Sequence, residues 1–145
     1  MKPTVLVVED QPALRRLIVR MLDRHGMEAL EAGRAAQGLA LVRERLGAVD
    51  LAVVDMVMPG MSGLDLATEL EREYPKVKIL YISGYTDSIA MDVIARRDPD
   101  AVLLKPFTEQ ALLDHVNRLM PTAQKKVVAA RDGAAAPSRR NGTSG

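Results

Sequence analysis

The chain contains no cysteine and no tryptophan, and aromatic residues make up only 3% of its 145 residues. The absence of cysteine excludes a disulfide scaffold and any metal site that uses thiolate ligands. No apolar run reaches the length of about 20 residues that a membrane-spanning helix needs. The first apolar run also meets Glu9 and Asp10 too early for a signal peptide. We therefore expect a cytoplasmic protein with an aliphatic core and no membrane partner.

Charge is distributed unevenly along the chain. Residues 1–120 carry 15 basic and 18 acidic side chains, whereas residues 121–145 carry five basic and one acidic. An acidic folded part does not suit a nucleic-acid surface, so we expect no specific nucleic acid partner. The last residues are rich in Ala, Gly, Ser, Pro and Arg and lack apolar periodicity. We expect one folded domain at 1–121 and a disordered basic tail or linker at 122–145.

Short apolar runs alternate with stretches of helical periodicity. The runs predict five strands, at residues 4–9, 27–32, 50–55, 77–83 and 101–104. Helices are expected between them and after the last one, at residues 12–25, 34–46, 62–74, 86–96 and 108–120. This alternation is typical of the α/β class, with a single doubly wound parallel sheet and helices on both faces. Periodicity alone does not give the order of the strands.

The helical stretches also predict their own ends and their buried faces. Ser62, with Asp65 three residues later, has the spacing of a capping box, and Thr108 is expected to cap the last helix. Apolar spacing places further side chains toward the core, among them Leu17, Leu46, Ile89 and Val93.

Polar residues follow four of the predicted strands at the point where each strand ends. Glu9 and Asp10 follow the first strand, Asp55 ends the third, Ser83 ends the fourth, and Lys105 follows the fifth. The carboxyl ends of parallel strands meet at one edge of the sheet, where open α/β sheets bind ligands. We therefore expect these five side chains to lie close together.

The chemistry of this set suggests phosphoryl transfer. Three neighbouring carboxylates would repel one another, and a divalent cation with hard oxygen ligands, Mg²⁺ above all, would relieve that repulsion. A carboxylate beside such a cation and a lysine can accept a phosphoryl group, with Asp55 as the attacking group and Lys105 as a second cation. Ser83 could donate a hydrogen bond to a phosphoryl oxygen.

Each of these residues also has a purely structural explanation. Asp10 could cap the helix that begins at Pro12, Ser83 could cap the next helix, and Lys105 could be a solvated surface residue. Separate structural roles would require four independent coincidences at one edge of the sheet, so we favour the explanation that these residues form a single site.

The quoted residues resemble the receiver domain of two-component response regulators. The resemblance covers about residues 3–120 and is carried by four segments: VLVVED, DMVMPGMSG, YISGY and LLKPF. It implies a flavodoxin-like fold with strand order 2-1-3-4-5.

The resemblance also implies a role for each residue of the site. Asp55 would be the phospho-acceptor. Asp10 and Asp55 would bind Mg²⁺ directly, Glu9 through a water molecule, and Val57 through its backbone carbonyl. Ser83 would be the switch hydroxyl.

Two positions next to the fifth predicted strand complete the implied site. Lys105 would pair with the phosphoryl oxygens, and the bond between Lys105 and Pro106 would be cis. Many receivers carry an aromatic switch residue three positions before this lysine, but this chain has Val102 there. The missing aromatic and the SGY segment are similar to receivers attached to hybrid sensor kinases.

The implied partners are proteins. The phosphoryl donor would be a sensor histidine kinase or a phosphotransfer protein, and a downstream effector would bind the surface of the fourth helix, fifth strand and fifth helix. A homodimer through the last two helices is compatible with the sequence but not required by it. Such a receiver transfers the group onto itself and is not an enzyme with an outside substrate.

Two alternatives stay open at this point. One is a pseudo-receiver that binds partners without phosphorylation. The other is a phosphohydrolase with an aspartyl-phosphate intermediate, which Val57 argues against because such enzymes usually carry a second Asp at that position. Val57 and Tyr85 are bulky and poor general bases, so they predict slow self-dephosphorylation.

Overall fold

The computed structural model describes residues 2–84 and 89–120 of the chain. The predicted tail at 122–145 and Tyr85 lie outside these residues. The described elements, in chain order, are β1 (Thr4–Val8), α1 (Pro12–Arg24), β2 (Glu28–Ala32), α2 (Ala35–Glu44), β3 (Leu51–Asp55), α3 (Gly63–Glu73), β4 (Lys78–Ser83), α4 (Ile89–Arg97), the short 3₁₀ helix η1 (Pro99–Ala101), β5 (Val102–Leu104) and α5 (Glu109–Leu119). No helix in the described part of the chain is long and apolar enough to cross a membrane.

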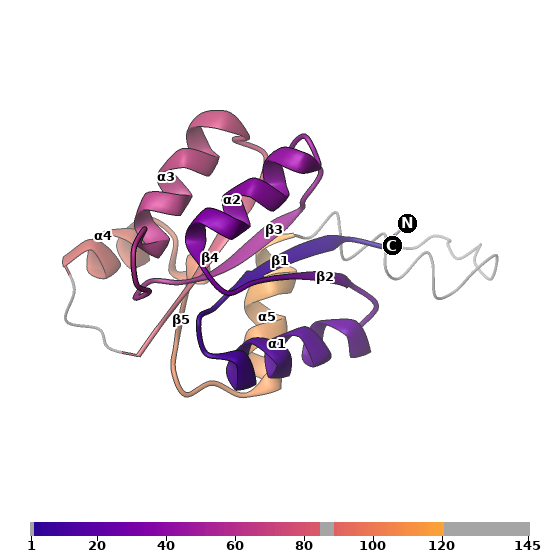
Figure 1. Cartoon of the computed structure of the whole chain (residues 1–145). Helices are drawn as coiled ribbons and strands as arrows, with labels where there is room; N and C mark the ends of the chain where they lie inside the picture. Colours follow the sequence, from indigo (N-terminus) through magenta and orange to yellow (C-terminus); the bar gives the residue numbers. More distant parts are fainter. Residues whose placement is uncertain (1, 85–88, 121–145) are drawn as a thin grey trace, which may run out of the picture.

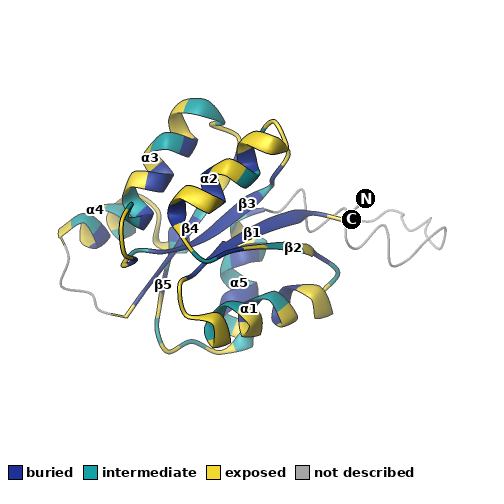
Figure 2. Ribbon diagram, in the orientation of Figure 1, coloured by how far each residue is buried: buried dark blue, intermediate teal, exposed yellow. Residues whose placement is uncertain are grey.

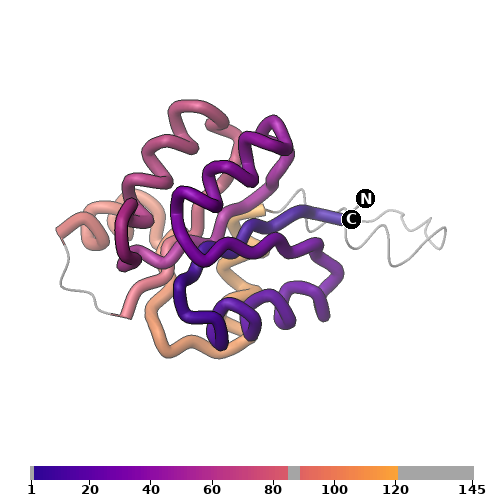
Figure 3. Tube along the Cα trace, viewed as in Figure 1, coloured from indigo at the N-terminus to yellow at the C-terminus, as the bar shows by residue number. Residues whose placement is uncertain are grey.

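The strands form one parallel sheet in the order β2-β1-β3-β4-β5. This confirms the doubly wound α/β fold and the strand order that the resemblance implied. Helices α1 and α5 cover one face of the sheet, and α2 and α3 cover the other (Figure 1). The tube view shows the same two layers of helices around the sheet (Figure 3). The carboxyl ends of all five strands therefore point to one edge.

The central strands are apolar because helices cover both of their faces. Every residue of β1 and β3 is buried (Figure 2), as expected for a parallel sheet between two helical layers. On one face the core includes Ile18 from α1 and Val116 from α5. On the other face it includes Leu39 from α2 and Leu70 from α3.

Both predicted helix caps are confirmed. The backbone N–H of Asp65 donates to Ser62 Oγ at 3.1 Å, and Asp65 Oδ2 accepts from the backbone N–H of Ser62 at 3.4 Å, which completes the capping box. Thr108 Oγ1 accepts from the backbone N–H of Ala111 at 3.0 Å. The first cap fixes the start of α3 at Gly63, eight residues after Asp55.

Four apolar side chains expected in the core are exposed instead, Leu17, Leu46, Ile89 and Val93, at 43%, 84%, 81% and 43% respectively. Leu46 lies beyond the end of α2 in a left-handed conformation, with φ of 54°. Helix α4 buries only Met91 among its described residues. The fifth strand begins at Val102 rather than at 101, because Ala101 belongs to η1.

Candidate functional site

The three carboxylates predicted to gather at the edge of the sheet do so. Glu9 follows β1 and is fully buried, Asp55 ends β3 with 4% of its surface exposed, and Asp10 is exposed to solvent. Each can present a carboxylate oxygen such that the three oxygens lie within 4.8 Å of one another. This spacing follows from the sheet, since β1 and β3 are adjacent and end at the same level.

Lys105 brings the positive charge to this cluster from the end of β5. Its Nζ lies 3.2 Å from Asp55 Oδ2 and 3.3 Å from Glu9 Oε1. The Lys105 backbone N–H donates to the carbonyl of Ser83 at 2.7 Å, and the peptide bond between Lys105 and Pro106 is cis. Burial alone would lower the pKa of the Lys105 ammonium, but the two carboxylates outweigh that effect and raise it.

The Glu9 carboxyl group has a strongly raised pKa. Burial raises the pKa of Glu9 to about 7, and the negative charge of Asp55 also raises it. The hydrogen bond from the backbone N–H of Gln11 and the positive charge of Lys105 lower this pKa, but by less. Glu9 Oε2 accepts the hydrogen bond from Gln11 at 3.0 Å. Glu9 Oε1 is buried and makes no hydrogen bond among the described residues, and its polar contact there is the ion pair with Lys105 Nζ at 3.3 Å. Three carboxylates, two of them buried and only one lysine beside them in the described part of the chain, form an all-oxygen donor set that fits a hard divalent cation.

The turn after β3 holds the Asp55 carboxylate open toward this cluster. The backbone N–H of Val57 donates to Asp55 Oδ1 at 3.0 Å, while the Val57 side chain is 77% exposed. The chain then turns at Gly60, whose φ of 77° is in the left-handed region that glycine tolerates. The remaining carboxylate oxygen of Asp55 is the one that contacts Lys105.

Gly63 lets α3 begin against the backbone of Asp55. A Cβ atom at this position would lie 2.3 Å from the Asp55 carbonyl oxygen and 2.8 Å from Val54 Cγ1. Gly63 was not among the residues predicted from the sequence. A glycine directly after a capping serine, where helix propensity disfavours it, was the signal that could have indicated a close backbone approach.

Ser83 and Val102 lie on the adjacent strands β4 and β5. Ser83 ends β4, is 4% exposed, and pairs in register with Leu104. Val102 pairs with Tyr81 and packs beside the cluster of Ala67, Tyr81 and Met91. At this register position the aromatic residue is Tyr81 on β4, and the residue on β5 is Val102.

Asp10 does not act as the cap of α1. The N-cap residue of this helix is Gln11, which makes no side-chain capping bond. The structural explanation considered for Asp10 is thus not what the fold uses it for.

Arg15 is a second residue that the sequence analysis missed. It donates to the backbone carbonyl of Glu9 at 2.9 Å and forms an ion pair with Glu31 at 3.0 Å. It ties α1 and β2 to the segment that carries Glu9 and Asp10. An arginine on an amphipathic helix gives no sequence signal for such a contact.

An apolar groove of about 500 Å³ adjoins the site beside Lys105. It is lined by Leu14, Leu17, Gly84, Lys105, Pro106 and Phe107.

Comparison with known proteins supports the resemblance. The sequence model of the response regulator receiver domain matches residues 5–117. The sensor kinase CckA of Brucella abortus (strain 2308) is 38% identical over 81% of the chain, which spans 12% of that protein. Protein PilH of Pseudomonas aeruginosa is 29% identical over 80% of the chain, which spans 96% of that protein.

Solved structures agree with the sequence comparison. The crystal structure of a response regulator receiver domain protein from Clostridium thermocellum is 26% identical, with a TM-score of 0.75, over 87% of this chain and 98% of the other. The chain spans 12% of the first curated relative and 50% of the next three. The chain thus belongs to the family of response regulator receiver domains of two-component systems.

Proposed function

We propose that this receiver accepts a phosphoryl group on Asp55 from the phosphohistidine of a sensor histidine kinase or a phosphotransfer protein. The observation that carries the proposal is the contact of 3.2 Å between Asp55 Oδ2 and Lys105 Nζ, at a carboxylate that is nearly buried and beside two others. A nearly buried carboxylate paired with one lysine, next to two acids, is suited to phosphoryl chemistry.

The residues of this edge would supply the protein groups that take part in the transfer. A carboxylate oxygen of Asp55 attacks the phosphorus in line and forms the new O–P bond. The P–N bond to the donor imidazole breaks, the nitrogen keeps that electron pair, and the imidazole recovers a proton from solvent. Lys105 Nζ neutralises phosphoryl oxygens, and the Ser83 hydroxyl donates a hydrogen bond to one of them.

We propose that Asp10 and Asp55 hold Mg²⁺ directly, Val57 through its backbone carbonyl, and Glu9 through a water molecule. The all-oxygen donor set of three carboxylates within 4.8 Å of one another supports this assignment. When bound, the ion supplies positive charge against the transferring phosphoryl oxygens.

The phosphoryl donor would dock on the apolar groove beside Lys105. Leu17 on α1 is 43% exposed there, and Leu14 and Phe107 line the same groove. An apolar helix face of the donor protein would cover Leu17 and bring its phosphohistidine to Asp55. This would also explain why Leu17 is exposed on a helix that buries Ile18, Met21 and Leu22.

The output would be a protein contact through α4, β5 and α5. Because Val102 replaces an aromatic at the switch position, we propose that the signal passes through the backbone around Ser83 and through α4. The chain would be a signalling module without turnover on an outside substrate. The 38% identity to part of a sensor kinase supports its kinship with receivers attached to hybrid kinases. A downstream effector or a second copy of the chain would bind the changed surface.

The proposal is tested by intact-protein mass after incubation with acetyl phosphate and Mg²⁺. We expect one added phosphoryl group, lost in Asp55→Asn and lost when Mg²⁺ is removed with EDTA. A folded protein that gains no group would contradict the proposal and favour a pseudo-receiver. Release of inorganic phosphate from a phosphate ester over many turnovers would instead favour the phosphohydrolase.

A further inference from the structure

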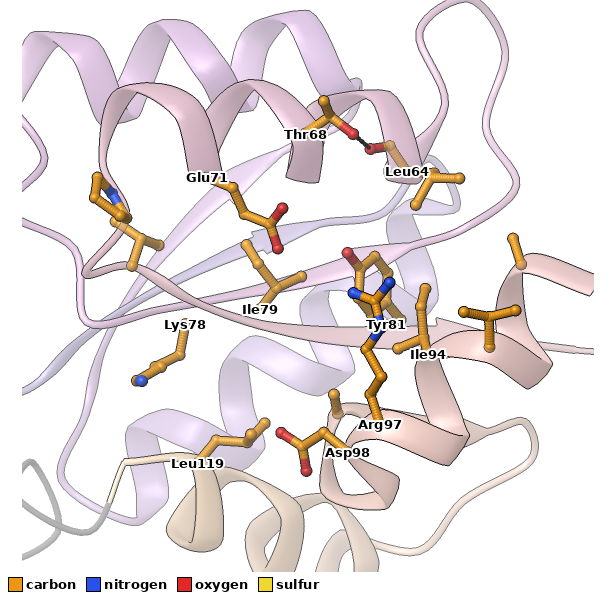
Figure 4. Close-up of a pocket in the computed structure, with 15 residues that line it drawn as sticks. Leu64, Thr68, Glu71, Lys78, Ile79, Tyr81, Ile94, Arg97, Asp98 and Leu119 are labelled. Atoms are coloured by element: carbon orange, nitrogen blue, oxygen red, sulfur yellow. Dashed lines mark hydrogen bonds between the residues drawn. The ribbon is translucent and has the colours of Figure 1, made fainter.

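A second groove lies between α3 and α4, away from the acidic site, with a volume of about 540 Å³ (Figure 4). Ile79 and Tyr81 of β4 form its floor, Leu64 and Ile94 contribute to its two walls, and Leu119 of α5 lies at one end. Its volume is in the range of sites that bind ligands or peptide side chains.

The groove is open because α4 packs loosely. Met91 is the only buried residue among the described part of α4. Val93 is 43% exposed and Ile94 is only partly buried, although both line the groove. An apolar surface that the fold leaves uncovered in this way marks an interaction site.

The rim of the groove carries charged side chains from both of its walls. Glu71 extends into the groove from α3, and Arg97 extends into it from α4 on the opposite side (Figure 4). No ion pair within residues 2–84 and 89–120 involves Glu71 or Arg97. Burial raises the pKa of the Tyr81 phenol to about 12, and the charge of Glu71 adds to this effect. Lys78 also lies on the rim. A segment that binds here must therefore match the negative charge of Glu71 on α3 and the positive charges of Lys78 and Arg97.

We propose that residues 121–132 of the same chain, the tail segment, bind this groove. The tail segment lies outside the described residues and follows directly after Met120, whose neighbour Leu119 lines the groove. It contains the basic pair Lys125 and Lys126, followed by an apolar run, Val-Val-Ala-Ala, at 127–130.

The two parts of the tail segment match the two parts of the groove. The apolar run would cover Ile79, Tyr81 and Ile94, and the basic pair would meet Glu71. Lys125 lies six positions after Leu119, which allows a span of up to about 20 Å in an extended chain. Because the segment is tethered at the mouth of the groove, its effective concentration there reaches about the millimolar range. Binding would bridge α3 and α4 and restrain α4, whether or not Asp55 is phosphorylated.

The absence of cysteine makes a paramagnetic test straightforward in the full chain. A nitroxide would be attached to the single cysteine of Ala129→Cys, and methyl NMR signals would be compared before and after its reduction. We expect the signals of Ile79 and Ile94 to lose at least half of their intensity, independently of protein concentration, while Leu17 on the other face keeps its intensity. Equal losses at Leu17 and Ile94, or no loss, would overturn the proposal. Losses that vanish on dilution would overturn it in favour of a second copy as occupant.

Reversing charges in the same spin-labelled chain tests the proposed ion pairs between Glu71 and the basic pair Lys125 and Lys126. Lys125→Glu with Lys126→Glu should restore at least half of the lost intensity at Ile94, and adding Glu71→Lys should bring the loss back. The matched control reverses the same number of charges farther along the chain, with Arg139→Glu and Arg140→Glu, and should leave the loss unchanged. A control as effective as the Lys125 and Lys126 pair would overturn the assignment of Glu71 as partner.

Discussion

The Nζ atom of Lys105 lies 3.2 Å from Oδ2 of Asp55, although 50 positions separate the two residues in the chain. The contact exists because β3 and β5 flank β4 in the same parallel sheet. It makes Lys105 the one described cation that contacts both Asp55 and Glu9.

Replacing Lys105 should slow phosphorylation more than it alters the fold. Lys105→Met removes the ammonium that would neutralise the phosphoryl oxygens, so we expect the rate of phosphorylation by acetyl phosphate to fall about 100-fold. Lys105→Arg keeps the positive charge, so its rate of phosphorylation should fall less than that of Lys105→Met. Rates are measured by intact mass over time at saturating Mg²⁺, and equal rates for the native chain and Lys105→Met would contradict the role.

The stability of the metal-free chain should depend on pH through Glu9. Its pKa is about 7 in the folded chain and 4.5 in the unfolded one, so the folded state holds the proton more tightly between these values. The free energy of unfolding should therefore fall as pH rises from 4.5 to about 7, by about 3 kcal/mol in total. Urea unfolding at several pH values in EDTA measures this.

Two controls isolate the Glu9 contribution. Glu9→Gln cannot titrate, so this part of the pH dependence should disappear. Saturating Mg²⁺ should raise stability most at the high end of the range, because a bound cation favours the ionised carboxyl. An unchanged slope in Glu9→Gln would show that another group is responsible.

Gly63→Ala should destabilise the chain and disturb Asp55. The added methyl would lie 2.3 Å from the Asp55 carbonyl oxygen, and such overpacking costs about 1–3 kcal/mol. Gly84→Ala is the matched control, because a Cβ there meets nothing within 4 Å. The free energy of unfolding of both variants is measured by chemical denaturation. Similar losses of stability would mean that the backbone around Gly63 shifts easily to accommodate the added methyl group.

Leu46 is a site where substitution should stabilise. Its φ of 54° is costly for a leucine, and its side chain is 84% exposed. Leu46→Gly relieves the left-handed strain, and we expect a gain of about 1 kcal/mol in the free energy of unfolding. Leu46→Ala removes the same exposed apolar surface without relieving the strain, so it should give no gain. A gain shared by both variants would point to the lost apolar surface instead.

Val57 should make the phosphorylated state long-lived. Its exposed side chain lies two residues beyond Asp55 and cannot activate water. Val57→Glu introduces a general base and should speed loss of the phosphoryl adduct about tenfold, whereas Val57→Leu should stay slow. Decay is followed by intact mass after removal of the donor, and a half-life of seconds in the native chain would contradict the prediction.

The sequence by itself determined the class of fold and the membership of the site. Alternating apolar runs and helical periodicity identify the strands and helices, because each pattern reflects a local repeat of the backbone. Parallel strands bring their carboxyl ends to one edge, so Glu9, Asp10, Asp55 and Lys105 could be expected together before any distance was known. The order of the strands came from the resemblance, since periodicity does not encode which strand is adjacent to which.

Only the tertiary structure decided which apolar faces are covered. Ile89 and Val93 have the spacing of a buried helix face, but this face of α4 does not pack against the sheet and both side chains are exposed. The contacts of Arg15 with Glu9 and of Gly63 with Asp55 likewise depend on how helices approach strand ends. Periodicity reports that a face is apolar, whereas its burial depends on a neighbour that is distant in sequence, and that is a property of packing alone.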